Sequence, residues 1–189
     1  MKKIAIFISG TGSNAQRIMD RFSSHDEIQV SCLISTKPNS EVAKTCRDLN
    51  VNYIESRFSE LEYEGILEQL EQLAIEWVVL AGFLKKIPHV ILRQFPRRMI
   101  NLHPSLLPKF GGKGMYGMHV HQAVIEAKEK ESGITIHYVN ENYDEGKIIA
   151  QITTPVHKSD DSTTLFKRIR QLEADHFPRV VEQELIKNG

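Results

Sequence analysis

Apolar runs and amphipathic segments alternate along the first half of the chain. The apolar runs are short and lack regular polar alternation, which is typical of strands that are buried on both faces. The segments between them carry apolar residues at helical spacing, such as Ile18, Met19 and Phe22. The predicted strands occupy residues 3–9, 28–35, 51–55, 76–83 and 98–102. The predicted helices occupy residues 13–24, 40–50, 60–74 and 89–96. We expect Ser40 to be the N-cap of the second helix.

The pattern changes in the second half, where two strands follow each other directly. The predicted helices there occupy residues 119–132 and 162–189, and the predicted strands occupy residues 134–140 and 147–156. Gly133 should end the first of these helices, and Pro178 should kink or interrupt the second. The sequence therefore predicts one α/β domain with a mostly parallel twisted sheet and helices on both faces. An antiparallel strand pair and a long C-terminal helix complete it.

Composition narrows the class of protein. The chain has 189 residues, of which 41% are hydrophobic and 25% are charged, as expected for one globular domain. Lys+Arg and Asp+Glu both number 24, so bulk charge favours neither nucleic-acid nor membrane binding. The first apolar run, of about six residues, is shorter than the ~7–15 residues of a signal-peptide core. We expect a cytoplasmic protein whose Cys32 and Cys46 are buried, reduced thiols.

The stretch SGTGSN, residues 9–14, joins the first predicted strand to the first predicted helix. Glycines let the backbone amides and the positive helix end face an anion, so this loop predicts a phosphate site. A dinucleotide fold would place an acidic residue at the end of the second strand, where the chain reads LISTKP. NAD is therefore disfavoured, whereas Ser35 and Lys37 leave NADP open. A plain strand-to-helix turn is the remaining alternative.

The stretch MINLHPSLLPKFGG, residues 99–112, carries two polar side chains where the fifth strand ends. Asn101 and His103 are two residues apart, so an extended chain places both on one side, and Pro104 stiffens the backbone directly after them. In acyl transfer, an amide can donate to a tetrahedral oxyanion and an imidazole can carry a proton. The alternative is that both side chains only cap free backbone groups.

Weaker signals lie elsewhere in the chain. Asp144, in the turn ENYDEG, could hold an imidazolium and set its tautomer, although such an aspartate usually serves the turn alone. His119 and His121 do not face one another on a helix, which argues against a metal site. Lys85 and Lys86 follow a strand end, where ligands of open α/β sheets bind, or they form a solvated surface.

These segments together resemble a known family. SGTGSN, VVLAGFLKKI, INLHPSLLPKF and YDEG occur in the order and spacing of the folate-dependent formyltransferases, and SGTGSN is similar to the ribonucleotide-binding branch. The likeness extends from Lys3 to about Val181. It implies a single formyltransferase domain over residues 1–189, with a ribonucleotide-binding half at 1–100 and a folate-binding and catalytic half at 101–189.

The resemblance implies roles for individual residues. The implied catalytic residues are Asn101, His103 and Asp144. The implied ribonucleotide-binding residues are Gly12, Ser13, Asn14, Arg170 and Glu173, the last holding the glycyl amine. The implied folate-binding residues are Leu84, Lys85, Lys86, Ile87, Asn101, Asn140, Glu141, Asn142, Tyr143 and Asp144. The anion of Asp144 should make His103 more basic than a free histidine.

The implied reaction moves the formyl group of 10-formyltetrahydrofolate to the glycyl amine of N1-(5-phospho-D-ribosyl)glycinamide, a step of purine biosynthesis. The implied protein uses small-molecule substrates and no metal, and is a monomer or a homodimer. The alternatives are a formyltransferase for an amino-sugar nucleotide and a non-catalytic nucleotide-binding regulatory module. Two features depart from the family: residues 110–118 form a longer loop, and Glu60 replaces an arginine for the folate's glutamate tail. Arg57 or the pair Lys85 and Lys86 could substitute for that arginine.

Overall fold

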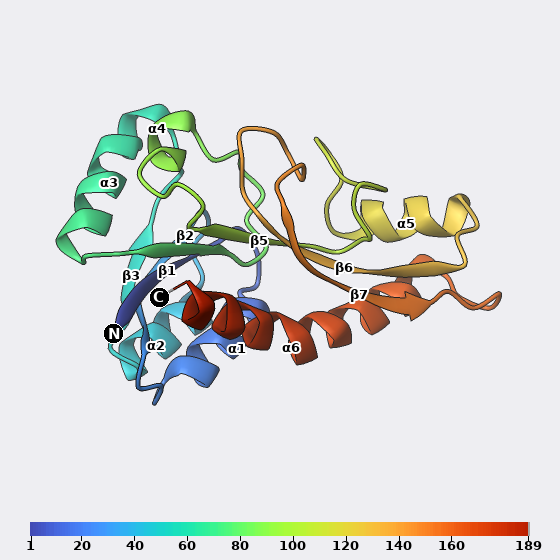
Figure 1. Cartoon of the computed structure of the whole chain (residues 1–189), viewed down its shortest axis with the longest axis horizontal. Helices are drawn as coiled ribbons and strands as arrows, with labels where there is room; N and C mark the ends of the chain where they lie inside the picture. The colour runs from blue at the N-terminus through green and yellow to red at the C-terminus, as the bar shows by residue number, and fades with distance from the viewer. Residues whose placement is uncertain (189) are drawn as a thin grey trace.

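A seven-stranded sheet in the order β3-β2-β1-β4-β5-β6-β7 forms the centre of the computed structural model, which describes residues 1–188 (Figure 1). The strands are β1 Lys2–Ile8, β2 Ile28–Ser35, β3 Asn52–Glu55, β4 Trp77–Leu80, β5 Met99–His103, β6 Glu131–Tyr138 and β7 Ile148–Pro155. The first five strands are parallel, and β6 and β7 add an antiparallel pair at one edge. The predicted fold class is confirmed.

Helices cover both faces of the sheet. They are α1 Ser13–Phe22, α2 Ser40–Asp48, α3 Tyr63–Gln72, α4 His89–Leu92, α5 Met118–Glu126 and α6 Ser162–Lys187, with a 3₁₀ turn, η1, at Glu60–Glu62. In Figure 1, α1, α2 and α6 lie on one side of the sheet and α3 and α4 on the other. Side chains of β1 therefore alternate between two cores: Ile4 and Ile6 join one, and Ala5 and Phe7 join the other. Burial on both faces explains why the strands read as continuous apolar runs.

The helix expected at residues 119–132 is shorter, and Gly133 does not end it. The helix ends at Glu126, and Gly133 instead lies inside β6, where it pairs with Thr153. A Cβ at Gly133 would lie 2.1 Å from the carbonyl oxygen of Ile152, so this glycine permits close approach of the two strands. The strand expected at 76–83 is also shorter: β4 is Trp77–Leu80, and the chain bends at Ala81 and Gly82.

Two further local predictions need correction. The N-cap of α2 is Asn39 and not Ser40: Asn39 has extended backbone and its side chain accepts a hydrogen bond from the Val42 N–H at 3.1 Å. Pro178 does not break α6, which continues to Lys187, whereas the kink expected at Pro178 stays a prediction. A proline inside a helix costs about 3 kcal/mol, which burial of neighbouring side chains such as Phe177 offsets here.

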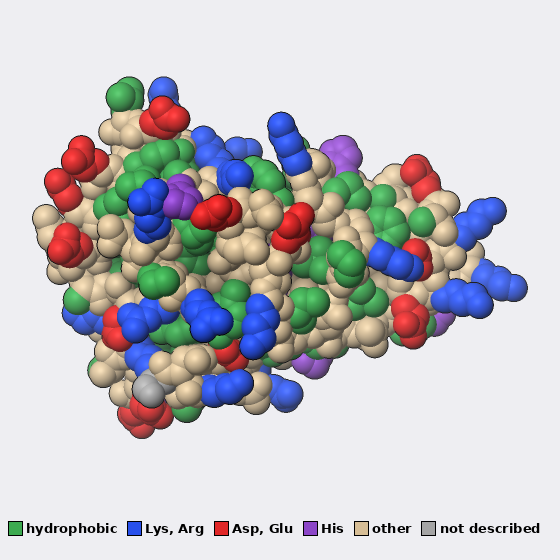
Figure 2. Space-filling model, turned by 45° about the horizontal axis from the view of Figure 1, so that its top comes forward, with side chains coloured by type: hydrophobic (Ala, Val, Ile, Leu, Met, Phe, Trp, Pro, Cys, Tyr) green, Lys and Arg blue, Asp and Glu red, His purple; other side chains and the backbone are tan. Residues whose placement is uncertain are grey.

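Cys32 and Cys46 are both buried and free, as predicted. Burial raises the pKa of Cys32 to about 12 and that of Cys46 to about 11, so both stay protonated at neutral pH. Over residues 1–188, no helix combines the length and apolarity needed to cross a bilayer. Basic and acidic side chains both occur across the face seen in Figure 2.

Candidate active site

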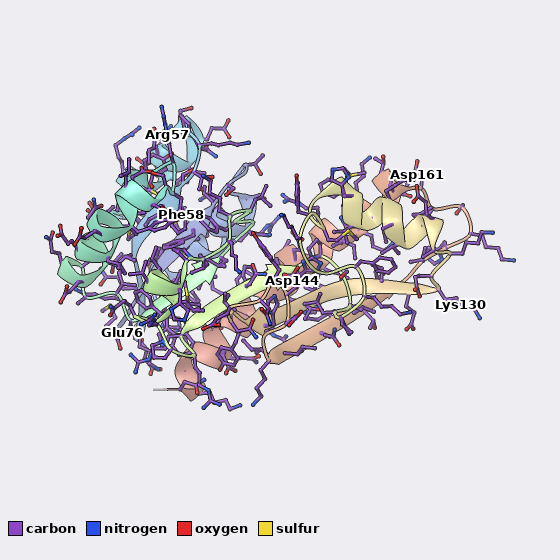
Figure 3. The ribbon with its side chains drawn as sticks, turned by 90° about the horizontal axis from the view of Figure 1, so that it is seen from above. Arg57, Phe58, Glu76, Lys130, Asp144 and Asp161 are labelled. Atoms are coloured by element: carbon purple, nitrogen blue, oxygen red, sulfur yellow. The ribbon has the colours of Figure 1, made fainter. Side chains whose placement is uncertain are left out.

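A cavity of about 730 Å³ opens at the carboxyl ends of β1, β4 and β5. The sheet order reverses between β1 and β4, and crevices at such switch points are where open α/β sheets bind ligands. The loops after these three strands, residues 112–117 and α6 all contribute to the wall. Figure 3 shows Asp144 near the middle of the molecule, between the part that carries α3 and the part that carries α5.

The loop between β1 and α1 forms one end of the cavity. Gly12 has φ 76, and a Cβ there would lie 2.5 Å from Cγ2 of Val42, so glycine is required both for the turn and for packing against α2. Asn39 fixes the loop from outside by donating to the carbonyl oxygens of Gly10 and Thr11. The free amides at the start of α1 therefore face the cavity without an acidic residue in the first turn, as an anion site requires.

Two charged residues of α6 reach this loop from a distant part of the sequence. Arg170 donates to Oγ of Ser13, 157 residues away. Glu173 is buried and its Oε2 accepts a hydrogen bond from Nδ2 of Asn14 at 2.8 Å. Burial raises the pKa of Glu173, although the bond from Asn14 and the charge of Arg170 oppose the shift. All five residues assigned to the ribonucleotide thus line one end of one cavity.

Asn101, His103 and Asp144 meet in the same cavity. Asn101 and His103 project from one side of β5, and Nδ1 of His103 lies 3.4 Å from Oδ2 of Asp144. Nε2 of His103 donates to the carbonyl oxygen of Phe110 at 2.8 Å. Phe110 and Asp144 have φ values of 55° and 57°, a strained region for residues other than glycine that is enriched at functional sites. Both strained residues contact the same imidazole.

His137 is a member of this cluster that sequence reasoning did not identify. Its Nδ1 lies 2.8 Å from the carbonyl oxygen of Tyr138, so Nδ1 carries the proton and Nε2 is an acceptor. Nδ2 of Asn101 donates to Nε2 of His137 at 3.0 Å, and Oδ1 of Asp144 lies 3.6 Å from the same nitrogen. His137 thereby orients the Asn101 amide. The pairing of Asn101 with His137 across β5 and β6 could have been found only from the strand register.

The prediction that His103 is unusually basic is wrong. Burial is the largest influence and lowers the pKa of His103; the charge of Asp144 and the bond to Phe110 raise it, but not enough to compensate. For Asp144, burial alone would raise the pKa, but the interaction with His137, the charge of His103 and the Gly112 N–H together hold it below its usual value. The resting pair at neutral pH is therefore a neutral imidazole beside a carboxylate.

The loop at residues 110–118 contacts Asp144 directly. The N–H of Gly112 donates to Oδ2 of Asp144 at 2.8 Å. A Cβ at Gly111 would lie 2.5 Å from Cδ2 of Leu107 and 3.2 Å from Cβ of Asp144, so only glycine lets the loop approach this closely. The extra residues of this chain are thus part of the cavity wall and part of the support of Asp144.

The residues assigned to the folate divide into two groups. Leu84 and Tyr143 line the cavity together with Asn101 and Asp144. The residues of that set outside the cavity wall are Lys85, Lys86, Ile87, Asn140, Glu141 and Asn142. Ile87 is buried in the core, Nε2 of His89 lies 2.6 Å from Glu141, and Lys86 lies 5.8 Å from the centre of the Tyr143 ring. No three His, Cys, Asp or Glu side chains in residues 1–188 are grouped so as to hold a metal ion.

A profile of the formyl transferase family matches residues 2–181, and the chain belongs to this family. The resemblance predicted from the motifs is confirmed. The chain is 39% identical to phosphoribosylglycinamide formyltransferase, chloroplastic, from Vigna unguiculata over 96% of its own length and 60% of the relative. It is 35% identical to phosphoribosylglycinamide formyltransferase from Haemophilus influenzae, over 96% of its length and 86% of the relative.

The solved structures agree with these relatives. The crystal structure of phosphoribosylglycinamide formyltransferase from Bacillus halodurans superposes with a TM-score of 0.88 at 32% identity, covering 100% of this chain and 97% of that one. The glycinamide ribonucleotide transformylase 1 of Geobacillus kaustophilus gives a TM-score of 0.85 at 32% identity, covering 98% and 99%. The chain spans only 60% and 64% of the length of two chloroplastic relatives that it matches.

Proposed function

We propose that this chain transfers the formyl group of 10-formyltetrahydrofolate to the glycyl amine of N1-(5-phospho-D-ribosyl)glycinamide, a step of purine biosynthesis. The observation that carries the proposal is the cavity itself, which joins an anion-binding helix end to an amide, an imidazole and a carboxylate. Formyl transfer to a phosphorylated amine needs a phosphate-binding helix end and a set of acyl-transfer side chains in one site. The family implies a folate-type formyl donor, and relatives named for this reaction support the acceptor.

The ribonucleotide would bind with its phosphate on the amides of Gly12, Ser13 and Asn14. Arg170 adds a positive charge at Ser13, which favours a dianion. Glu173 lies beside Asn14, at the phosphate end of the cavity, so we assign it to the ribose hydroxyls and not to the glycyl amine. The glycyl amine then extends toward Asn101 and His103.

The chemistry falls to three side chains. One N–H of the Asn101 amide is held by His137, and the second is free to donate to the oxyanion that forms when the amine attacks the formyl carbon. Such a donor contributes about 10²–10³-fold. His103, neutral at rest, takes the proton of the attacking amine and returns it to the departing folate nitrogen, which contributes about 10²–10⁴-fold. Asp144 stabilises the imidazolium in between.

The imidazole must change one partner to act. Nδ1 of His103 faces Asp144, and Nε2 donates to the carbonyl oxygen of Phe110. We therefore assign proton transfer to Nε2: it leaves the carbonyl oxygen of Phe110, and the neutral ring changes to the tautomer with its proton on Nδ1, facing Asp144, so that Nε2 is free to accept the proton of the amine. The loop at residues 110–118 provides that carbonyl, so its movement accompanies catalysis.

The folate would lie between two loops on the other side of the catalytic residues. The contact of Lys86 with the Tyr143 ring joins the loop at residues 84–87 to the loop at 140–144. Lys85 donates to the carbonyl oxygen of Arg57, so the exposed cations Arg57 and Lys85 lie close together. They would bind the glutamate tail of the folate in place of the arginine that Glu60 replaces. Residues 1–100 and 101–189 thus each supply part of both subsites. We further propose a cytoplasmic enzyme without a metal, as a monomer or a homodimer.

Mixing the full chain with 10-formyltetrahydrofolate and the glycinamide ribonucleotide tests the proposal. Folate absorbance should change only when both substrates are present. Turnover with an amino-sugar nucleotide but not with the glycinamide ribonucleotide would assign the chain to that other acceptor. Ribonucleotide binding without turnover would favour a regulatory module, and cofactor binding in a titration with NADPH would favour an oxidoreductase.

A further inference from the structure

His121 is a buried titratable residue of the cavity wall to which the reaction above gives no role. It is the fourth residue of α5 and is 1% exposed. Its ring packs edge-on against Phe166 of α6, with ring centres 5.5 Å apart at 61°. Both rings belong to the wall of the cavity. Packing therefore fixes the orientation of His121 relative to the site.

The hydrogen bonding of His121 is incomplete in the free protein. Nδ1 is buried and has no hydrogen-bond partner in the described part of the chain. A buried N–H without a partner is more costly than a buried ring acceptor without one, because the N–H forfeits the stronger interaction with water. The tautomer with the proton on Nε2 is therefore favoured. Since Nδ1 is buried, Nε2 is the nitrogen that can meet a ligand in the cavity.

The surroundings keep this imidazole neutral. Burial lowers the pKa of His121 to about 4, and repulsion from His103 acts in the same direction. A second cation so close to His103 would oppose proton uptake there. A neutral N–H donor adds a hydrogen bond to the site without that penalty.

The position of His121 indicates which part of the ribonucleotide it would meet. The guanidinium of Arg170 lies 5.9 Å from the centre of the Phe166 ring, and Arg170 donates to Ser13 of the phosphate loop. His103 lies close enough for its charge to affect His121. His121 therefore lies between the phosphate end of the cavity and the catalytic end. The part of the substrate between those ends is the ribosyl group and its glycinamide amide.

We propose that Nε2–H of His121 donates a hydrogen bond to an oxygen of the ribosylglycinamide portion of the substrate, and so positions the acceptor for attack. This rests on the proposed function. His121 is kept polar at the expense of an unsatisfied Nδ1 in the free protein, because the donor is needed when the acceptor is bound.

The test compares His121→Phe, which retains an aromatic ring on Phe166, with His121→Gln, which restores an N–H donor. His119→Phe is the matched control, because His119 is exposed on the same helix and lies outside the cavity wall. We expect His121→Phe to raise the KM for the glycinamide ribonucleotide about 3–10-fold, the value of one neutral hydrogen bond, and to leave the KM for the folate donor unchanged. The Tm should not fall, since an unsatisfied buried nitrogen is removed. His121→Gln should recover part of the loss.

Three outcomes would overturn the proposal. An unchanged KM for the ribonucleotide would exclude the hydrogen bond. An equal rise in the KM values of both substrates, together with a lower Tm, would mean a purely structural role. If His121→Phe does not fold, His121→Leu repeats the test with a smaller side chain that also lacks a donor. Failure of the wild-type chain to bind the ribonucleotide would instead overturn the proposed function, and this inference with it.

Discussion

At the scale of single residues, the site depends on how burial and charge compete around His103. The carboxylate of Asp144 raises the pKa of His103, but burial lowers that pKa by a larger amount. A histidine that is neutral at rest is ready to accept a proton, whereas an imidazolium would first have to lose one. The carboxylate of Asp144 therefore stabilises the site most strongly once His103 has taken up the proton.

Asp144→Asn should lower turnover with little change in either Michaelis constant, because the charge that stabilises the imidazolium is lost while the substrates still bind. The acidic limb of the kcat profile should move to lower pH, since the influence that raises the pKa of His103 is removed. His103→Asn should cost a similar amount, and the double variant little more than the worse single one. Steady-state kinetics across pH would measure all three. Additive losses would mean that Asp144 acts independently of His103.

His121 should make the fold sensitive to acid. The pKa of His121 is about 4 in the folded chain against 6.5 for an ordinary histidine, so below pH 6.5 the unfolded chain binds more protons. The free energy of unfolding should therefore fall as the pH drops from 6.5 toward 4. Urea unfolding of His121→Phe should show a flatter dependence over that range, because the contribution of His121 is removed while those of the other titrating groups remain. An identical pH dependence in both proteins would contradict the lowered pKa.

At the scale of elements, the loop at residues 110–118 connects the cavity wall to the catalytic carboxylate. Phe110 holds Nε2 of His103 by its carbonyl oxygen, and Gly112 holds Oδ2 of Asp144 by its N–H. Gly111 allows the backbone to approach so closely, and Gly112 adopts the positive φ of 95° that the turn needs. The conformation of this loop therefore sets the geometry of His103 and Asp144 together.

Gly111→Ala tests that connection. The new Cβ would lie 3.2 Å from Cβ of Asp144 and 2.5 Å from Leu107, so the loop must shift and Asp144 must lose part of its support. We expect turnover to fall by about tenfold or more, as misplacement of a reacting group predicts. Gly65→Ala in α3 is the matched control, because Gly65 lies outside the cavity wall and its Cβ would meet nothing within 4 Å. Kinetics and Tm of both variants would be compared, and equal losses of turnover would exclude a specific effect on Asp144.

At the scale of the whole molecule, the parallel order of the strands assembles the site. The loops after β1 and β5 come from strands far apart in sequence but meet at the carboxyl end of the sheet. Helix α6 then brings Arg170 and Glu173 to the phosphate loop. The exposed cations Lys85 and Lys86 lie beside the mouth of this assembly, next to the cavity residue Leu84. Their charge would act on a ligand that extends out of the cavity.

Replacing Lys85 and Lys86 together with alanine should raise the Michaelis constant mainly for polyglutamylated folate. Each exposed contact is worth roughly 0–1 kcal/mol and is screened by salt, so the effect should shrink as the ionic strength rises. Kinetics with mono- and polyglutamylated donors at low and high salt would measure it. An equal response of the two donors would show that these lysines are only solvated charges.

Much of the fold and part of the site follow from local sequence. Continuous apolar runs specify buried parallel strands, and the spacing of Asn101 and His103 places them on one side of β5 whatever surrounds them. The glycines of residues 9–14 likewise make the turn that exposes the helix amides. These features depend on neighbouring residues alone, so the sequence by itself determined them.

Only the tertiary structure decided the rest. His137 reaches Asn101 through the register of β5 and β6, and Arg170 reaches Ser13 across 157 residues of chain. Gly133 proved to be a strand residue because another strand packs against it. The direction of the pKa shift of His103 depends on how completely the assembled cavity wall excludes water. Desolvation and long-range pairing are properties of the packed molecule, and no local pattern of residues encodes them.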